Sequence, residues 1–195
     1  GTVTNTATGQ NLEGARVSIK GTTHQVFTDS QGVYRFLDVP AVRETLHEGH
    51  QGIARLDPGQ TVFMAVFQYF IGNTDWSIRA LHNIVLLTDS ASRVFPVPYD
   101  FDWSGVIATR YALPDTSLPI RSVKERLYSG YCGSIEDFEP VFARFRQHRA
   151  AIEALYDLEP LDRDERDRAR RYYADFYRLI DDPARVRREM LKLCQ

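Results

Sequence analysis

The sequence predicts an α+β protein in which a short antiparallel β segment precedes a mostly helical region that contains one β-hairpin. Residues 1–41 show short runs of alternating apolar and polar residues, which are typical of half-buried strands. From residue 54 onward, apolar residues recur at three- and four-residue steps, the period of an amphipathic helix. Within that region, residues 82–89 and 94–101 are rich in β-branched and aromatic side chains and flank a short polar link, as in a hairpin.

Composition restricts the classes of function. A hydrophobic fraction of 43% and an aromatic fraction of 12% are those of a folded globular protein. The formal net charge is -2, with 24 basic and 26 acidic residues, so we expect no nucleic-acid partner. The longest apolar run, residues 62–72, is shorter than the roughly 20 residues that cross a bilayer, and we expect no transmembrane segment. The two cysteines, Cys132 and Cys194, fit neither a disulfide framework nor a zinc-binding spacing.

The β segment is indicated by alternation and by turn residues. Ala15, Val17 and Ile19 alternate with polar residues in "GARVSIKG". Asp29 and Gly32 then stand at the two ends of a predicted four-residue turn, after which "VYRFLDVP" resumes the strand pattern. These features predict short antiparallel strands.

The runs "TGQNLEGARVSIKGT" and "TDSQGVYRFLDVP" resemble the opening half of a carboxypeptidase-regulatory-like domain, a small β-sandwich module common in secreted and outer-membrane bacterial proteins. The resemblance covers residues 1–41 and implies an extracytoplasmic scaffold or binding module without catalytic residues. The later strands of the sandwich are missing from the sequence. We therefore expect a protein partner to cover the exposed β edge.

We expect residues 54–195 to form the helical region. Residues 42–53 show neither the strand pattern nor the helix pattern and form a candidate junction between the two parts. Asp57 and Pro58 predict the N-cap and first position of a central apolar helix. Ser134 predicts the cap of an amphipathic helix. Two further helices are expected around residues 172–180 and from Asp182 onward.

The hairpin and the loop before it bring four polar residues together. A turn centred between residues 91 and 92 would pair residues whose numbers sum to 183, which places Asn83 opposite Asp100. Asp102 would share a strand face with Asp100, and Asp75 lies in the loop after the central helix. Carboxylate and amide oxygens are the ligands that Mg²⁺ and Mn²⁺ prefer. The alternative is that these residues are solvent-exposed turn formers and caps.

Residues 56–157 also resemble the C-lobe of atypical bacterial kinase-like proteins of the HipA-like and spore-coat (CotH) types. The resemblance lies in "GNTDWS", "LHN" and "PYDFD". It implies that Asp75 would be catalytic and that Asn83 and Asp100 would hold Mg²⁺ or Mn²⁺ on the phosphates of ATP. Asp102 would be a second metal-binding acid. The implied partners are a nucleotide and an unidentified phosphate acceptor.

The sequence departs from that kinase pattern in two respects. Asn83 follows Asp75 by eight residues, where protein kinases have five, and neither a glycine-rich phosphate loop nor an N-lobe can be identified. Half of the nucleotide site would thus be missing, and the chain alone is expected to be inactive. Two hypotheses remain: a fragment or fusion with a kinase-like site, and a non-catalytic extracytoplasmic module.

Overall fold

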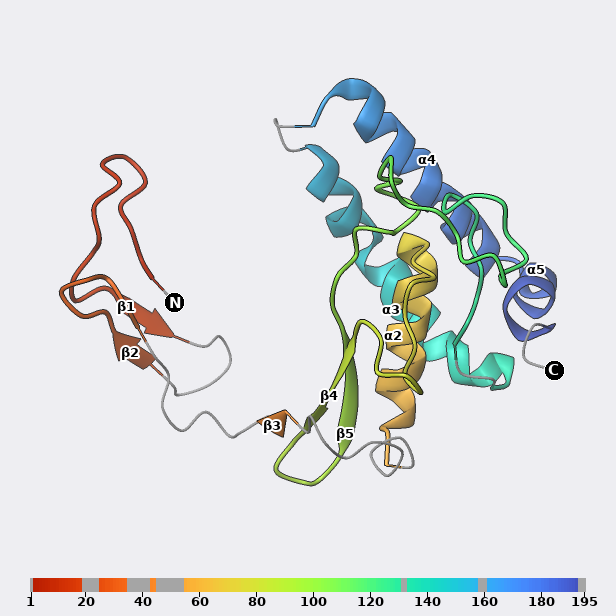
Figure 1. Ribbon diagram of the computed structural model, residues 1–195, viewed down its shortest axis with the longest axis horizontal. Coiled ribbons are helices and arrows are strands. Elements are labelled where there is room, and N and C mark those ends of the chain that lie inside the picture. The colour runs from red at the N-terminus through yellow and green to blue at the C-terminus, as the bar shows by residue number, and fades with distance from the viewer. Residues whose placement is uncertain are drawn as a thin grey trace. The chain divides into compact units, whose positions relative to one another are not determined.

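The computed structural model describes residues 2–18, 25–34, 43–44, 55–130, 133–157 and 161–192 (Figure 1). The chain divides into two compact units, Gly1–Val42 and Arg43–Gln195. Short antiparallel strand pairs and several helices confirm the predicted α+β class. No helix in the described residues is long and apolar enough to cross a membrane.

The described residues of the N-terminal unit contain one strand pair. Strands β1 (Arg16–Ser18) and β2 (Gln25–Phe27) are antiparallel, and Val17 lies opposite Val26. An isolated bridge between Thr2 and Val33 joins the start of the unit to its later part.

The predicted turn at Asp29 is confirmed. The Asp29 carboxylate accepts hydrogen bonds from the backbone N–H groups of Gln31 and Val33, both at 2.9 Å. Gly32 adopts φ +70°, and a Cβ there would lie 2.7 Å from the carbonyl oxygen of Val3. Glycine is therefore required by both the conformation and the space.

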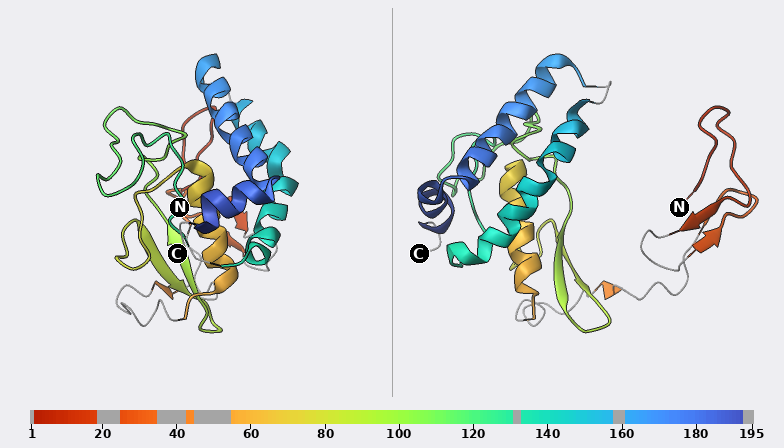
Figure 2. Two further views of the ribbon diagram at one scale, coloured as in Figure 1. Left: turned by 90° about the vertical axis from the view of Figure 1, so that its right-hand side faces the viewer. Right: turned by 180° about the vertical axis from the view of Figure 1, so that it is seen from behind.

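In its described residues, the second unit combines a three-stranded sheet with four helical segments and two short helical turns. In chain order its elements are β3 (Arg43–Glu44), α2 (Pro58–Ile71), β4 (Ile84–Thr88), β5 (Val94–Pro98), α3 (Ile135–Ala154), the 3₁₀ turn η1 (Leu155–Asp157), α4 (Arg163–Ile180), α5 (Pro183–Val186) and the π-helical turn η2 (Arg187–Leu191). Helix α2 packs between the β4–β5 hairpin and the helices α3 and α4 (Figures 1 and 2).

Helix α2 begins where the sequence predicts. The Asp57 side chain accepts a hydrogen bond from the N–H of Gln60, and Pro58 occupies the first helical position. Gly72 ends the helix in the left-handed conformation, with φ 71°. The predicted central position is confirmed, because most of the helix is buried, including Val66 at 0% exposure.

Aromatic side chains from three helices form the centre of the core. The ring of Phe70 on α2 stacks on Tyr173 of α4, with centroids 4.2 Å apart. Phe145 on α3 and Phe176 on α4 meet Phe70 at 5.1 Å and 5.0 Å. Such aromatic contacts add roughly 0.5–1.5 kcal/mol each beyond the burial of their area. Their convergence fixes α2 relative to α3 and α4.

The sheet order is β3–β4–β5, with both pairs antiparallel. Strand β3 consists of two residues of the predicted junction, which pair with Leu87 and Thr88 of β4. The rest of residues 42–53, together with Cys132 and Cys194, lies outside the described residues.

The predicted register of the hairpin is wrong by one residue. Strand β4 pairs with β5 at a residue sum of 182, as in Ile84 opposite Pro98. The loop is shorter than expected because Asp89 caps it: its carboxylate accepts hydrogen bonds from the N–H groups of Ala91 and Arg93. Ser92 takes a left-handed conformation, φ 61°, which closes a three-residue loop.

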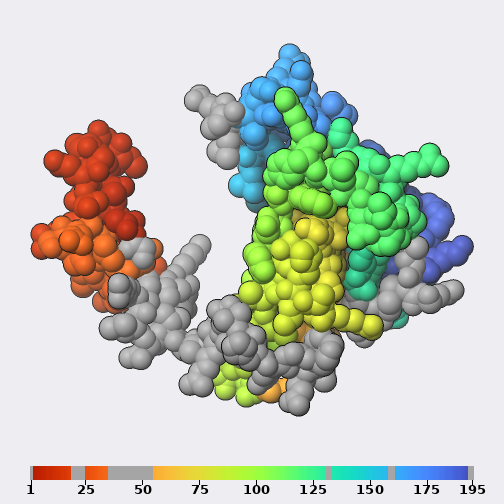
Figure 3. All heavy atoms as spheres, in the orientation of Figure 1, coloured from red at the N-terminus to blue at the C-terminus, as the bar shows by residue number. Residues whose placement is uncertain are grey.

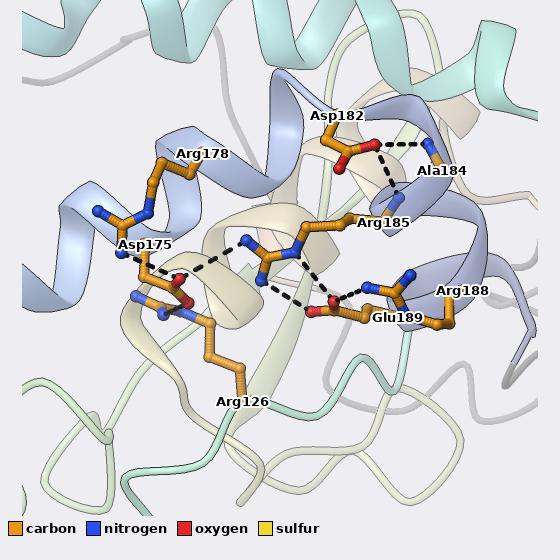
Figure 4. Close-up of polar contacts among 8 residues, drawn as sticks. All are labelled: Arg126, Asp175, Arg178, Asp182, Ala184, Arg185, Arg188 and Glu189. Carbon is orange, nitrogen blue, oxygen red and sulfur yellow. Dashed lines mark hydrogen bonds and ion pairs between the residues drawn. The ribbon is translucent and has the colours of Figure 1, made fainter.

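Charged side chains join α4 to the C-terminal turns. Asp175 lies between Arg126, Arg178 and Arg185 at 3.2–3.6 Å, as Figure 4 shows. Glu189 accepts hydrogen bonds from Arg185, at 3.0 Å and 3.2 Å. The interleaved charges of the C-terminal third therefore form a connected network, which a sequence pattern alone does not specify.

Candidate functional site

The loop after α2 is held by its own polar side chains. Asn73 is 1% exposed, and its side-chain oxygen accepts a hydrogen bond from the N–H of Asp75 at 3.0 Å. Its carbonyl oxygen accepts one from the indole N–H of Trp76 at 3.1 Å. Gly72 ends helix α2 in the left-handed conformation, which turns the backbone sharply. This turn sets the path of the loop that carries Asp75 away from the buried end of the helix.

His82 and Asn83 both contact Asp75. The Asn83 Nδ2 donates to the carbonyl oxygen of Asp75 at 2.9 Å and to its Oδ2 at 3.0 Å. The His82 Nε2 lies 2.9 Å from the other carboxylate oxygen, Oδ1. Asn83 adopts φ +53°, a conformation that asparagine tolerates better than most residues. The structure thus brings Asp75 and Asn83 together.

Asp100 does not pair with Asn83 as the sequence predicts. The N–H of Tyr99 donates to the carbonyl oxygen of Asn83 at 3.0 Å, so Tyr99 lies opposite Asn83. Strand β5 has ended at Pro98, and Asp100 itself takes φ +57°. The strand argument that placed Asp100 and Asp102 on one face therefore fails.

Asp100 and Asp102 nevertheless interact. A hydrogen bond between the two carboxyl groups and the negative charge of Asp102 raise the pKa of Asp100, and the charge of Asp75 raises it further. The proximity arises from the turn after β5, where the N–H of Ser104 donates to the carbonyl oxygen of Phe101.

Asp102 is positioned by residues further along the chain. The Tyr111 hydroxyl donates to its Oδ2 at 2.8 Å, and the Thr109 hydroxyl donates to its carbonyl oxygen at 3.0 Å. The hydrogen bond to Asp102 raises the pKa of Tyr111, because the carboxylate stabilises the protonated phenol.

The candidate site thus consists of two contacting pairs, Asp75 with Asn83 and Asp100 with Asp102. Like-charge repulsion between the carboxylates makes the site attractive to a cation or a hydrogen-bond donor. Across the part of the chain that the structure describes, no group of three or more His, Cys, Asp or Glu side chains is arranged to hold a metal ion.

A cavity of about 400 Å³ opens beside Asp75. Its lining includes Trp103 and the loop residues Leu113, Asp115 and Leu118. In the space-filling view the green segment that follows β5 forms much of the visible face of the C-terminal unit (Figure 3). Trp103 borders the cavity, whereas Trp76 is buried in the core.

Sequence reasoning missed two residues of the site. Asn73 stands two positions before Asp75 and orders the loop through its side chain; the Asn-x-Asp spacing is a recognisable signal for such a turn. Tyr111 reaches Asp102 from a loop nine residues later, and nothing in its sequence context marks that contact.

Comparison with known families gives a match at the start of the chain. Residues 1–62 match the carboxypeptidase regulatory-like domain, in agreement with the resemblance of residues 1–41. The chain matches no curated protein and no solved structure. The kinase-like resemblance of residues 56–157 gains no support from these comparisons and stays a prediction.

Proposed function

We propose that the chain is a non-catalytic, extracytoplasmic binding module of the carboxypeptidase-regulatory-like type, whose β segment receives a strand from a protein partner. The match over residues 1–62 carries this proposal. In the described residues of this unit, β1 and β2 form a two-stranded sheet. An isolated two-stranded pair is marginally stable in water, and further strands or other covering structure would stabilise it.

The backbone of the pair offers hydrogen-bonding groups to a partner. The N–H of Thr28 donates to the carbonyl oxygen of Ala15, so Ala15–Thr28 and Val17–Val26 are hydrogen-bonded pairs in the antiparallel alternation. The residues between them direct their N–H and C=O groups outward: Arg16, Ser18, Gln25 and Phe27. An added strand would bind these groups.

The side chains of the pair are also incompletely covered. Val17 and Val26 are only half-buried, and 62% of the Phe27 surface is exposed. An added strand with alternating apolar residues would bury part of this surface, at roughly 25 cal/mol per Å². Backbone hydrogen bonds would give affinity, and contacts to Phe27 would give sequence preference.

A peptide-display selection tests this proposal. Random dodecapeptides selected on the full chain should be enriched in alternating β-branched or aromatic residues. Their binding should be weakened by Ser18→Pro or Gln25→Pro, because proline removes one outward N–H. Thr8→Pro, in an exposed turn of the same unit, is the matched control. Binders that are indifferent to both strand variants would contradict the proposal.

A second candidate function, a kinase-like phosphotransferase site, is favoured by one observation. The Asn83 amide contacts Asp75, and the charges of Asp102 and Asp75 raise the pKa of Asp100. The four residues therefore lie close to one another. In this candidate Asp75 would orient or deprotonate the acceptor hydroxyl. The cavity beside Asp75 would receive the acceptor.

The donor set is compatible with Mg²⁺ or Mn²⁺ on a nucleotide. Asp100 and Asp102 would supply carboxylate oxygens. Asn83 would supply its amide oxygen, since its Nδ2 already donates to Asp75. Mg²⁺ is commonly held by one or two carboxylates together with substrate phosphates. The cation would neutralise charge on the transferring phosphoryl group.

A labelling experiment separates the two candidates. The full chain is incubated with ATP labelled on its γ-phosphate, with Mg²⁺ or Mn²⁺, beside an Asp75→Asn variant. The binding-module proposal expects equal background label in both proteins. Transfer that is lost in Asp75→Asn would favour the phosphotransferase.

A further inference from the structure

A second cavity lies among the helices of the C-terminal unit. It has a volume of about 460 Å³ and is lined mainly by aromatic and aliphatic side chains of α2, α3 and α4, among them Phe63, Phe67, Phe145, Ile152 and Tyr156. None of the four candidate-site residues lines it. Its size and apolar lining are those of a site for a small organic ligand, typically about 300–1,000 Å³.

The floor of this cavity is pre-formed by contacts that belong to the core. The Phe63 and Phe145 rings lie 5.9 Å apart, and the hydroxyl groups of Tyr156 and Tyr173 share a 2.7 Å hydrogen bond. Both hydroxyls therefore have a partner, and the cavity wall they belong to stays largely apolar. Leu155 lies at the rim with 61% of its surface exposed. A ligand would pack against a rigid apolar wall and would bury the exposed side chain of Leu155.

Two basic side chains border the apolar wall. Arg144 and His148 stand four residues apart on α3, so they lie on the same face of the helix. The Arg144 guanidinium lies 4.6 Å from the centroid of the Phe63 ring. Within the described residues, neither Arg144 nor His148 forms an ion pair, whereas the neighbouring Arg146 and Arg149 pair with carboxylates.

We infer that this cavity binds a single-chain amphiphile with a carboxylate head group, such as a medium-chain fatty acid. The alkyl chain would lie against Phe63, Phe67 and Ile152, where burial of apolar surface is favourable. The carboxylate would lie at Arg144, whose planar guanidinium suits bidentate binding of a carboxylate and stacks on an aromatic ring at the same time. His148 would supply a second hydrogen bond.

The lining argues against other classes of small ligand. A sugar or a nucleotide would place many hydroxyl or phosphate groups against aromatic walls that offer few partners, and each unpaired polar group is costly. A cationic amphiphile would bring like charge to Arg144. The apolar wall and the basic rim together therefore favour an alkyl chain that carries one anionic end group.

Isothermal titration of the full chain tests the inference. The probes are dodecanoate, dodecanol and dodecyltrimethylammonium; the two charged probes are kept below their micelle-forming concentrations and dodecanol below its solubility limit. We expect saturable one-to-one binding of dodecanoate, with at least tenfold weaker binding of the alcohol and of the ammonium compound. Arg144→Gln should weaken dodecanoate binding about tenfold or more, because one charge-assisted contact is lost. Arg163→Gln, a 90% exposed arginine on α4, makes the same charge change and should have no effect.

A filling variant checks the position of the alkyl chain. Ile152→Trp should abolish binding by occupying the cavity, while its circular dichroism and unfolding transition establish that it is folded. Absence of saturable dodecanoate binding would overturn the inference. So would equal affinity for the three probes, equal affinity in Arg144→Gln and the parent, or full binding by a folded Ile152→Trp.

Discussion

The Asn83 side chain donates two hydrogen bonds to Asp75, one to its carbonyl oxygen and one to its carboxylate, at 2.9 Å and 3.0 Å. This contact joins the loop after α2 to the start of the β4–β5 hairpin. It explains how polar residues distant in sequence gather at one place, even though the strand register differs from the prediction.

The first prediction concerns this contact. Asn83→Ala should lower the free energy of unfolding by about 2–4 kcal/mol, because it removes two hydrogen bonds and places alanine in a left-handed conformation. Asn83→Gly removes the same hydrogen bonds but tolerates φ +53°. Urea denaturation should therefore find the glycine variant about 1 kcal/mol more stable than the alanine variant. Equal stability of the two would contradict the left-handed conformation.

The second prediction concerns the acidic pair. Because Asp102 raises the pKa of Asp100, Asp102→Asn should lower the Asp100 pKa toward its ordinary value of 3.8. A raised pKa means that the folded state holds the proton more tightly than the unfolded state, so this contribution to stability is present at low pH. It is lost as the pH rises through the raised pKa of Asp100. Carboxyl-carbon NMR titration measures the shift, and an unchanged Asp100 pKa would show that the pair does not interact.

The third prediction uses the close approach of Gly72 and Tyr172. A Cβ at residue 72 would lie 1.8 Å from the Tyr172 hydroxyl, and Gly72 also has φ +71°. Gly72→Ala should therefore destabilise the protein by more than about 2 kcal/mol. The buried Tyr172 hydroxyl has no hydrogen-bond partner among the described residues, so Tyr172→Phe alone should be neutral or slightly stabilising. In thermal unfolding, the double variant Gly72→Ala with Tyr172→Phe should regain part of the stability that Gly72→Ala alone loses. A double variant no more stable than Gly72→Ala would count against this contact.

The fourth prediction tests the second candidate function. If Asp100 helps to hold a metal–nucleotide complex, Mn²⁺ with a non-hydrolysable ATP analogue should raise the unfolding temperature of the parent and not of Asp100→Asn, because only binding to the folded state stabilises it. Asp164→Asn, an exposed aspartate in the first turn of α4 and away from the candidate site, is the control. Equal shifts in the parent and Asp100→Asn would remove the metal-site hypothesis.

Local signals in the sequence were sufficient for many elements. Asp57 and Pro58 begin α2 as expected, since capping chemistry depends on neighbouring residues. The hairpin strands were also predicted, but their register was not. The reason is that Asp89 shortens the loop through hydrogen bonds from Ala91 and Arg93, and a one-residue change in loop length changes every pair.

The candidate site was predictable only in part. The closeness of Asp75 and Asn83 agrees with the expectation, yet it comes from side-chain hydrogen bonds and a left-handed residue instead of cross-strand pairing. The contact of Tyr111 with Asp102 depends on the path of a long loop, for which no periodicity exists. The cavity bordered by Arg144 depends on three helices packing together, which no single segment encodes.

Backbone amide hydrogen exchange tests the proposed strand addition most directly. The amides of Arg16, Ser18, Gln25 and Phe27 are compared in the full chain alone and with a selected peptide bound. The account predicts at least tenfold slower exchange on alternate residues of one strand, either β1 or β2, and no such change in the C-terminal unit. Slowing confined to the helices, or a peptide that binds with no protection of either strand, would contradict it.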